Sequence, residues 1–139
     1  MKQKIYGLVG RNISYSFSQG YFQKKFADKS LIYHRYLNFD IPTIRELPEI
    51  ISETEGLKGL NVTIPYKEEV IPLLDGLSKN AAIIGAVNTI TISKKGKLKG
   101  YNTDHYGFRK ALMPMLKPCH HKALILGTGG ASKAVAFAL

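Results

Sequence analysis

Short apolar runs alternate along the chain with segments whose apolar residues recur at helical spacing. The runs rich in strand-forming residues cover positions 5–10, 31–39, 57–64 and 86–93. The segments expected to be helical cover positions 18–30, 44–51, 78–84 and 103–116. Strands that alternate with helices indicate the α/β class, and we expect a three-layer sandwich with a mostly parallel sheet.

Two local signals concern the ends of these helices. Ser78 is a preferred residue type for the N-cap of a helix, so it is expected to begin a helix that runs through Ile84. Pro48 lies inside the apolar pattern of positions 44–51. Because proline cannot donate a backbone hydrogen bond, this helix is expected to be kinked or broken early.

The chain closes with KALILGTGGASKAVAFAL, residues 122–139. This segment predicts a buried strand at 123–126, a glycine turn and a helix, the opening of a Rossmann-type domain. Such a unit needs parallel neighbours to cover its faces, so we interpret the chain as a fragment. We expect a complete domain over residues 1–102, a linking helix over 103–118 and the truncated start of a dinucleotide-binding domain over 119–139.

Composition narrows the class of protein. The hydrophobic content of 45% and charged content of 22% are those of a globular protein. The net charge is +10, but the basic residues are scattered, which argues against a nucleic-acid partner. The N-terminal apolar run is too short for a signal peptide or a membrane span, and one cysteine allows no internal disulfide. We therefore expect a cytoplasmic protein with no membrane partner.

Polar groups gather where the third predicted strand ends. In NVTIPYK, the side chains of Asn61, Thr63 and Lys67 offer an amide, a hydroxyl and an amine beside Pro65. In RNISYSFS, Ser16 and Ser18 are alternate residues, which in an extended stretch point the same way and could grip one carboxylate. The alternative is an ordinary serine-rich loop that leads to an N-cap at Ser18.

Two more polar residues follow predicted strands or lie inside them. Asn88 interrupts an apolar strand, and a buried asparagine needs partners, whether structural or from a ligand. Asp104 begins a predicted helix beside the expected hinge between domains, where a cleft would open. Taken alone, Asp104 fits a helix cap better than a functional site, since capping carboxylates are common.

The glycines of LGTGGAS fit a dinucleotide-binding turn. Gly127 and Gly129 would allow backbone N–H groups to approach a pyrophosphate at a helix N-terminus, with Ser132 as the third small residue. The alternative is a plain strand-to-helix turn. The residue that selects NAD or NADP would lie beyond Leu139. The four histidines have no metal-ligand spacing, so no metal site is expected.

Taken together, these stretches resemble the shikimate dehydrogenase family. The family pattern runs from a glycine strand end through Ser-x-Ser-Pro, Asn-Val-Thr-x-Pro-x-Lys, Gly-Ala-Val-Asn-Thr and Asn-Thr-Asp to Gly-x-Gly-Gly-Ala-Ser. All six stretches occur here in this order and span nearly the whole chain. Gln19 stands where the family has the proline of the second stretch.

The resemblance implies a reaction and a set of residue roles. It implies NADP-dependent, reversible reduction of 3-dehydroshikimate to shikimate, in chorismate and aromatic amino-acid biosynthesis. Ser16 and Ser18 would bind the substrate carboxylate, and Thr63, Asn88 and Asp104 its ring hydroxyls. Lys67 would be the catalytic acid and base, aimed from the stiff support of Pro65, with Asp104 as its partner. The residues implied for the NADP pyrophosphate are Gly127, Gly129, Gly130, Ala131 and Ser132.

Two other functions stay open at this point. One is a quinate/shikimate dehydrogenase that uses NAD, and the other is a fragment that binds shikimate without catalysis. The sequence also leaves the oligomeric state open, a homodimer included.

Overall fold

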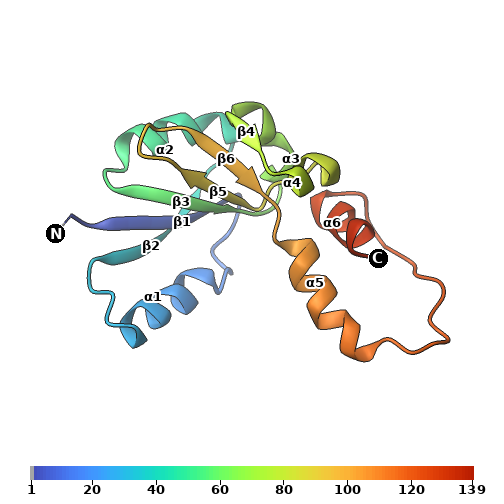
Figure 1. The fold of residues 1–139 in the computed structure, drawn as a ribbon. Coiled ribbons are helices and arrows are strands. Elements are labelled where there is room, and N and C mark those ends of the chain that lie inside the picture. The colour runs from blue at the N-terminus through green and yellow to red at the C-terminus, as the bar shows by residue number, and fades with distance from the viewer. Residues whose placement is uncertain (1) are drawn as a thin grey trace.

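One mixed sheet of six strands forms the centre of the structure, a computed structural model that describes residues 2–139 (Figure 1). The strands are β1 (Lys4–Gly10), β2 (His34–Asp40), β3 (Leu57–Val62), β4 (Gly76–Leu77), β5 (Thr89–Ile92) and β6 (Leu98–Tyr101). Their order across the sheet is β2-β1-β3-β5-β6-β4. Strand β5 pairs antiparallel with both β3 and β6, and the other neighbours pair parallel. The expected mostly parallel sheet is confirmed, with β5 as the reversed strand.

Helices and short 3₁₀ turns connect the strands. The α-helices are α1 (Ser18–Asp28), α2 (Leu47–Glu53), α3 (Tyr66–Glu69), α4 (Lys79–Ile84), α5 (Asp104–Leu112) and α6 (Gly130–Ala138). The 3₁₀ turns are η1 (Ile44–Glu46), η2 (Ile71–Leu73) and η3 (Met113–Met115). Within residues 2–139, none of the helices combines the length and the apolar sequence that crossing a bilayer requires.

Two apolar clusters lie on opposite faces of the sheet and make it the middle layer. Val9 packs in the larger cluster with Leu47 of α2, and Leu8 packs in the smaller one with Phe22 of α1. Because successive side chains of a strand point to opposite faces, α1 and α2 cover different sides of the sheet, as Figure 1 shows. The three-layer arrangement predicted from the sequence is confirmed.

Both predicted helix signals are found in the structure. The hydroxyl of Ser78 accepts a hydrogen bond from the backbone N–H of Ala81 at 3.2 Å, and α4 ends at Ile84. Gly85 follows with a φ of 70°, the left-handed conformation that glycine adopts at helix ends. Pro48 lies in the first turn of α2, and the preceding turn η1 is 3₁₀ rather than α. The expected early break therefore falls just before α2.

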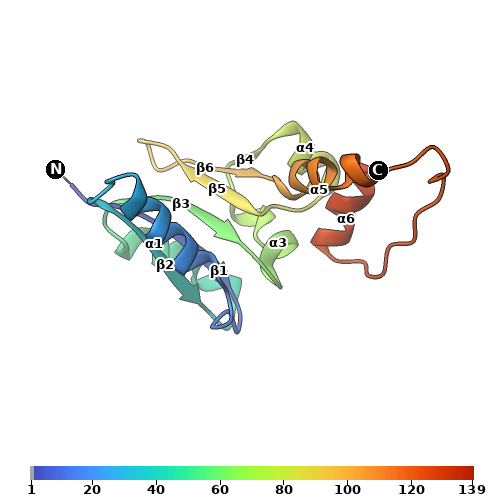
Figure 2. The same cartoon turned by 90° about the horizontal axis from the view of Figure 1, so that it is seen from below.

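The strand predicted at 123–126 is wrong for this structure. These residues have no regular secondary structure, and Leu124 and Leu126 are each 86% exposed. A strand is stabilised by hydrogen bonds to a neighbouring strand, and no strand of residues 2–139 lies beside this segment. The helix that should follow does form, as α6. It lies beside α5, and the chain between the two helices loops outward (Figure 2).

Candidate active site

Lys67 and Asp104 meet at one edge of the sheet. Lys67 lies in α3 just after β3, and Asp104 is the first residue of α5 just after β6. Strands β3 and β6 are both antiparallel to β5, so they run in the same direction and their carboxyl ends reach the same edge. Lys67 Nζ donates to Asp104 Oδ2 at 2.6 Å. The lysine side chain is 16% exposed and the aspartate 34%, so the ion pair is partly shielded from water.

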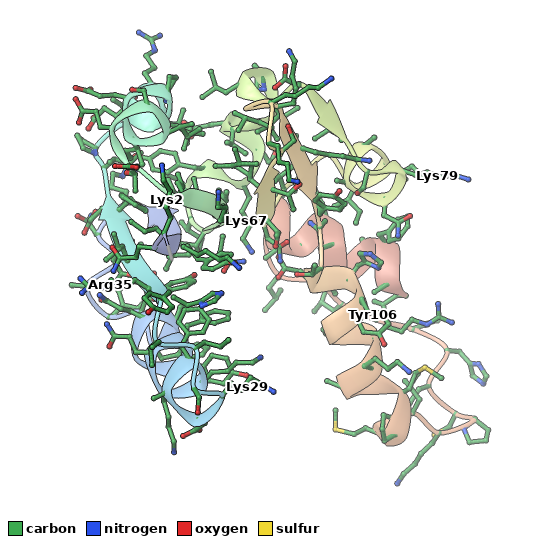
Figure 3. All side chains as sticks on the ribbon, turned by 60° about the vertical axis from the view of Figure 1, so that its left-hand side comes forward. Lys2, Lys29, Arg35, Lys67, Lys79 and Tyr106 are labelled. Carbon is green, nitrogen blue, oxygen red and sulfur yellow. The ribbon has the colours of Figure 1, made fainter. Side chains whose placement is uncertain are left out.

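The backbone around Lys67 is fixed from two sides. Tyr66 is 1% exposed, and its hydroxyl donates to the carbonyl oxygen of Ile41 at 2.7 Å. The carbonyl oxygen of Lys67 accepts from the backbone N–H of Val87 at 2.7 Å. The backbone of Lys67 therefore lies in a fixed turn, next to the segment that carries Asn88. Figure 3 shows Lys67 between the two parts of the molecule, whereas Lys29 and Lys79 project outward.

Asp104 does not serve as a helix cap, which was the alternative that the sequence favoured. Asn102 takes that part: its Oδ1 accepts from the backbone N–H of Asp104 at 3.0 Å and of His105 at 3.4 Å. Asn102 is itself 5% exposed and donates to the carbonyl oxygen of Ala86 at 3.1 Å. Because Asn102 satisfies the start of α5, the Asp104 carboxylate is left for Lys67 and its neighbours. Sequence reasoning missed this role, although an asparagine before a helix start is a known capping signal.

Asn88 is held directly against the Asp104 carboxylate. Its Nδ2 donates to Asp104 Oδ1 at 2.8 Å and to Thr103 Oγ1 at 2.8 Å. Its Oδ1 accepts from the backbone N–H of Thr103 at 2.9 Å. The buried asparagine thus has structural partners, and each oxygen of the Asp104 carboxylate has one donor, Lys67 or Asn88.

A hollow of about 350 Å³ opens over these groups. The residues that line it are Leu8, Phe17, Ser18, Tyr21, Phe22, Asn61, Val62, Thr63, Lys67, Asn88 and Asp104. Four separate segments thus bring Ser18, Thr63, Lys67, Asn88 and Asp104 to one cavity. The aromatic residues of α1 in its wall were not singled out from the sequence, because their spacing on an amphipathic helix indicates core packing equally well.

Ser16 and Ser18 do not share one direction as expected. Phe17 between them has helical backbone angles, with φ −75° and ψ −12°, so the stretch is not extended. The hydroxyl of Ser16 accepts from the backbone N–H of Ser18 at 3.3 Å, and Ser16 is not among the residues that line the hollow. The alternative of an N-cap at Ser18 is not observed either, since Ser18 is the first residue of α1.

The glycine turn places the start of α6 beside Lys67. Gly127 has a φ of 124°, a conformation that side chains rarely adopt, and α6 begins at Gly130. A Cβ atom on Gly130 would lie 3.0 Å from the Cβ atoms of both Lys67 and Ala86. The unpaired N–H groups of the first turn of α6, which includes Ala131 and Ser132, could bind an anion. The groups expected at a phosphate therefore lie next to the Lys67 side chain.

The ion pairs show which acidic residue Lys67 contacts. If Lys67 only neutralised its acidic neighbours, it would pair with Glu68 or Glu69. Instead it pairs with Asp104, and Glu68 pairs with Lys133 of α6. Among residues 2–139, no three His, Cys, Asp or Glu side chains gather as a metal site would require.

Comparison with protein families gives a match over most of the chain. Residues 8–90 match the family described as "Shikimate dehydrogenase substrate binding domain". An NADP(+) shikimate dehydrogenase of Methanopyrus kandleri is 42% identical over 138 residues. That match covers 97% of this chain and 47% of the relative, so the chain spans about half the length of the curated relatives it matches.

Solved structures agree with this match. Shikimate dehydrogenase 1 of Peptoclostridium difficile superimposes with a TM-score of 0.85 at 37% identity, covering 98% of this chain and 50% of that one. A shikimate 5-dehydrogenase of Thermus thermophilus, solved in complex with NADP(H) and shikimate, superimposes with a TM-score of 0.80 at 38% identity. That superposition covers 98% of this chain and 51% of the other.

Proposed function

The chain belongs to the shikimate dehydrogenase family, and we propose that the hollow beside Lys67 binds shikimate and 3-dehydroshikimate. The intact enzyme would interconvert the two with NADP in the biosynthesis of chorismate and aromatic amino acids. The observation that carries the proposal is the ion pair of Lys67 and Asp104, at 2.6 Å, in the wall of a cavity that Asn88 and Thr63 also line. One amine, one carboxylate, one amide and one hydroxyl suit a ligand with several hydroxyl groups.

In this proposal, Lys67 handles the proton. Its ammonium would donate to the oxygen of the reacting carbonyl during reduction and would take the proton back during oxidation. Asp104 orients the ammonium, because it already accepts a hydrogen bond from it at 2.6 Å. Asn88 keeps the carboxylate in place from the other side. Thr63, Asn88 and Asp104 would contact ring hydroxyls, and Ser18, which lines the hollow, would bind the substrate carboxylate.

The start of α6 supports a dinucleotide near Lys67. Gly127, Gly129, Gly130, Ala131 and Ser132 would hold the pyrophosphate through backbone N–H groups. NADP, when bound, would supply or accept the hydride. The close contact of Gly130 with the Lys67 stem supports a site in which the proton donor and the cofactor turn are adjacent. We propose NADP rather than NAD as the cofactor, because the relatives are named NADP(+) shikimate dehydrogenases.

A domain division and a compartment complete the proposal. Residues 1–102 would form the substrate domain, 103–118 the link and 119–139 the beginning of the dinucleotide-binding domain. A reducing compartment such as the cytoplasm suits a chain whose single cysteine, Cys119, is free and exposed.

Calorimetry on the 139-residue chain tests the substrate site. We expect weak binding of shikimate, because the polar residues of the hollow are assembled. We expect no tight binding of NADP, because residues 123–126, which precede the glycine turn, form no strand.

The Asp104→Asn variant serves as the control, since it keeps the shape of the side chain and removes the charge that pairs with Lys67. Its binding of shikimate should be weaker than that of the parent chain. Equal binding by both would contradict the proposed site, and submicromolar binding of NADP would contradict the division into domains. Stronger binding of quinate than of shikimate would indicate a different substrate of the same class.

A further inference from the structure

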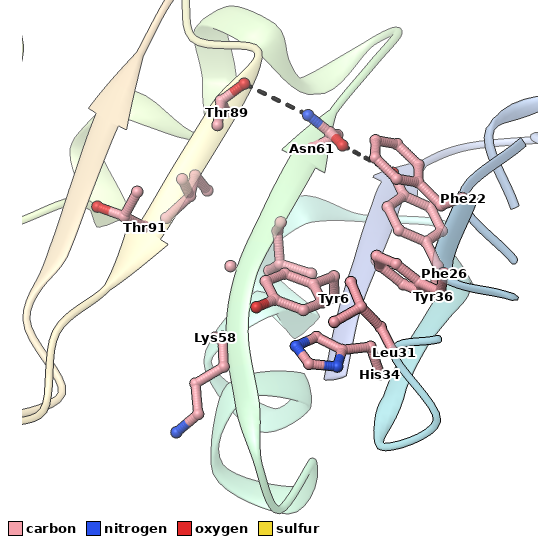
Figure 4. Close-up of a pocket in the computed structure, with 14 residues that line it drawn as sticks. Tyr6, Phe22, Phe26, Leu31, His34, Tyr36, Lys58, Asn61, Thr89 and Thr91 are labelled. Atoms are coloured by element: carbon pink, nitrogen blue, oxygen red, sulfur yellow. Dashed lines mark hydrogen bonds between the residues drawn. The ribbon is translucent and has the colours of Figure 1, made fainter. Parts of the chain in front are cut away.

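A series of hydrogen bonds continues from Asn88 along the sheet, through Thr89 and Asn61 to Tyr36. Thr89 Oγ1 lies 3.0 Å from Asn88 Oδ1, and Asn61 Nδ2 lies 3.3 Å from Thr89 Oγ1. The hydroxyl of Tyr36, on β2, lies 2.8 Å from Asn61 Oδ1. Figure 4 shows Asn61 between Thr89 of β5 and a group of aromatic side chains that includes Tyr36 of β2 and Phe22 of α1. Three strands of the sheet, β2, β3 and β5, are thus linked to one side chain of the candidate active site.

The donor and the acceptor of every hydrogen bond in this series can be determined. The backbone N–H of Thr103 can only donate, so the Asn88 atom that it contacts must be Oδ1. Thr89 must then give its single hydroxyl proton to this oxygen and can only accept from Asn61. The remaining oxygen of Asn61 accepts from Tyr36.

Tyr36 is suited to be the first donor in this series of hydrogen bonds. Burial raises the pKa of its hydroxyl far above the ordinary value of a tyrosine, so the hydroxyl keeps its proton. The ring is 2% exposed and stacks on Phe22, with 4.5 Å between the ring centroids. The hydroxyl therefore stays directed at Asn61.

All donors point toward the Asp104 carboxylate. Tyr36 donates to Asn61, Asn61 to Thr89, Thr89 to Asn88, and Asn88 to Asp104. Hydrogen bonds that follow one direction polarise one another, so each strengthens the next. The last bond of the series runs from Asn88 Nδ2 to the Asp104 carboxylate, so this bond at the candidate site is strengthened by the bonds before it.

We infer that Thr89 is a positioning residue: its hydroxyl, held by Asn61, fixes the Asn88 amide with Nδ2 toward Asp104. This inference deepens the proposed function and rests on it, because its consequence for binding concerns the same shikimate site. Thr89 itself does not line the hollow. It lines a separate cavity of about 370 Å³ on the α1 face of the sheet, and Asn61 and Phe22 border both spaces. Thr89 thus acts on the site through the two residues it bonds, Asn88 and Asn61, and not by contact with a ligand in the hollow.

Thr91 offers a matched control on the same strand. It lies two residues from Thr89, on the same face of β5, and lines the same cavity. Its hydroxyl makes no hydrogen bond to any of residues 2–139. Thr89→Val and Thr91→Val therefore make the same chemical change on the same face of β5, where Thr91 is the more exposed of the two, and only the first removes a bond to Asn88. Thr89→Ser restores the hydroxyl.

The experiment compares these three variants of the 139-residue chain by nuclear magnetic resonance and by calorimetry with shikimate. The two Nδ2 proton resonances of Asn88 report its bonds to Asp104 and Thr103 without any ligand. We expect Thr89→Val to move them and to speed their exchange with water. We also expect it to weaken shikimate binding about 5- to 10-fold, the share of one hydrogen bond. Thr89→Ser and Thr91→Val should match the parent chain in both measurements.

The outcomes separate this inference from the proposed function. Unchanged Asn88 resonances in Thr89→Val would overturn the inference, and so would equal changes in Thr91→Val. Failure of the parent chain to bind shikimate would overturn the proposed function, while the Asn88 resonances would still decide the role of Thr89. If Thr89→Val does not fold, Tyr36→Phe replaces it, since it removes only the first donor. It should move the Asn88 resonances in the same direction by a smaller amount, and no movement would overturn the inference.

Discussion

At the scale of single residues, Lys67 is placed by the residues next to it in the chain. Tyr66, the first residue of α3, and Val70, which directly follows the helix, are buried, with 1% and 0% of their surfaces exposed. In so short a helix, burial of these two residues directs Lys67 toward the opposite side, where Asp104 lies. The neighbouring sequence offers Glu68 and Glu69 as partners and the family resemblance implies Asp104, and in the fold Lys67 pairs with Asp104.

Lys67→Ala in the intact enzyme should lower the turnover number about 10²–10⁴-fold, the usual share of general acid–base catalysis. The Michaelis constant for shikimate should change much less, because the proposed contacts of Thr63, Asn88 and Asp104 with the bound substrate would remain. A lower turnover number with an unchanged Michaelis constant indicates an interaction that is made mainly in the transition state. Steady-state kinetics at saturating NADP measures both quantities.

Lys95→Ala provides the control for this variant. Lys95 is an exposed lysine in the turn between β5 and β6, so its loss removes one positive charge without touching the hollow. Its turnover number should equal that of the parent enzyme. A Lys67→Ala enzyme with the parent's turnover number would leave Lys67 without a catalytic role.

At the scale of elements, Asp75 joins the short strand β4 to the hairpin of β5 and β6. Its carboxylate accepts from the backbone N–H of Leu98 at 2.8 Å and from Lys97 Nζ at 2.6 Å. Its own N–H donates to the carbonyl oxygen of Leu98 at 3.0 Å. A two-residue edge strand gains little from its own ladder, so this side chain contributes to its attachment.

The bonds of Asp75 predict a pH dependence of stability. The Leu98 N–H first, and then Lys97, lower the pKa of Asp75 below the ordinary value of about 3.9. A carboxyl group with a lowered folded-state pKa stabilises the fold above its unfolded pKa, and this contribution is lost as the pH falls through the folded value. The free energy of unfolding of the parent chain and of Asp75→Asn should therefore differ near pH 6, and the difference should shrink as the pH falls through the lowered folded-state pKa of Asp75.

Urea unfolding across this pH range measures the difference. Lys97→Ala is the matched comparison, because it removes the second cause and leaves the bond from Leu98. Its loss of stability near pH 6 should be smaller than that of Asp75→Asn. A difference between the parent chain and Asp75→Asn that stays constant with pH would show that the Asp75 charge does not act in this way.

At the scale of the whole molecule, α6 is fastened to the part of the fold that carries the site. Ala134 is fully buried in a cluster with Ile84 and Ala86, and Lys133 pairs with Glu68. Gly130, the first residue of α6, lies against Ala86 and Lys67. The small residues Gly130 and Ala134 of α6, with Ala86 opposite, let the helix approach the sheet closely.

Gly130→Ala should therefore destabilise the chain, although alanine favours helices. A Cβ at this position would lie 3.0 Å from Lys67 Cβ and from Ala86 Cβ, and crowding of this kind costs about 1–3 kcal/mol. The control is Gly107→Ala in α5, where a Cβ would meet nothing within 4 Å. There the better helix propensity of alanine should raise the free energy of unfolding by about 0.5–1 kcal/mol.

Thermal or urea unfolding distinguishes the two glycines, and resonances of Lys67 in Gly130→Ala report whether its stem moves. Equal stabilisation by Gly130→Ala and Gly107→Ala would mean that α6 is not in close contact with Lys67. In that case the contact of α6 with the sheet domain would be looser than the structure shows.

The sequence by itself determined what depends on neighbouring residues. The apolar runs at 5–10 and 57–64 became β1 and β3, the hydroxyl of Ser78 begins α4, and Pro48 falls where a 3₁₀ turn changes to α-helix. Strand propensity, capping and the missing N–H of proline act within a few residues, so they can be recognised without the fold. The distinctive motifs also identified the family, because their order along the chain is a property of the sequence alone.

Only the tertiary structure decided what depends on segments far apart in the chain. The reversed direction of β5, the bond of Lys67 to Asp104 and the capping of α5 by Asn102 follow from the packing of elements. The apolar run at 123–126 remains without a strand for the same reason: a strand exists only where a neighbour supplies its hydrogen bonds. Local sequence gives a segment its tendency, and the contacts between distant segments decide whether that tendency is realised.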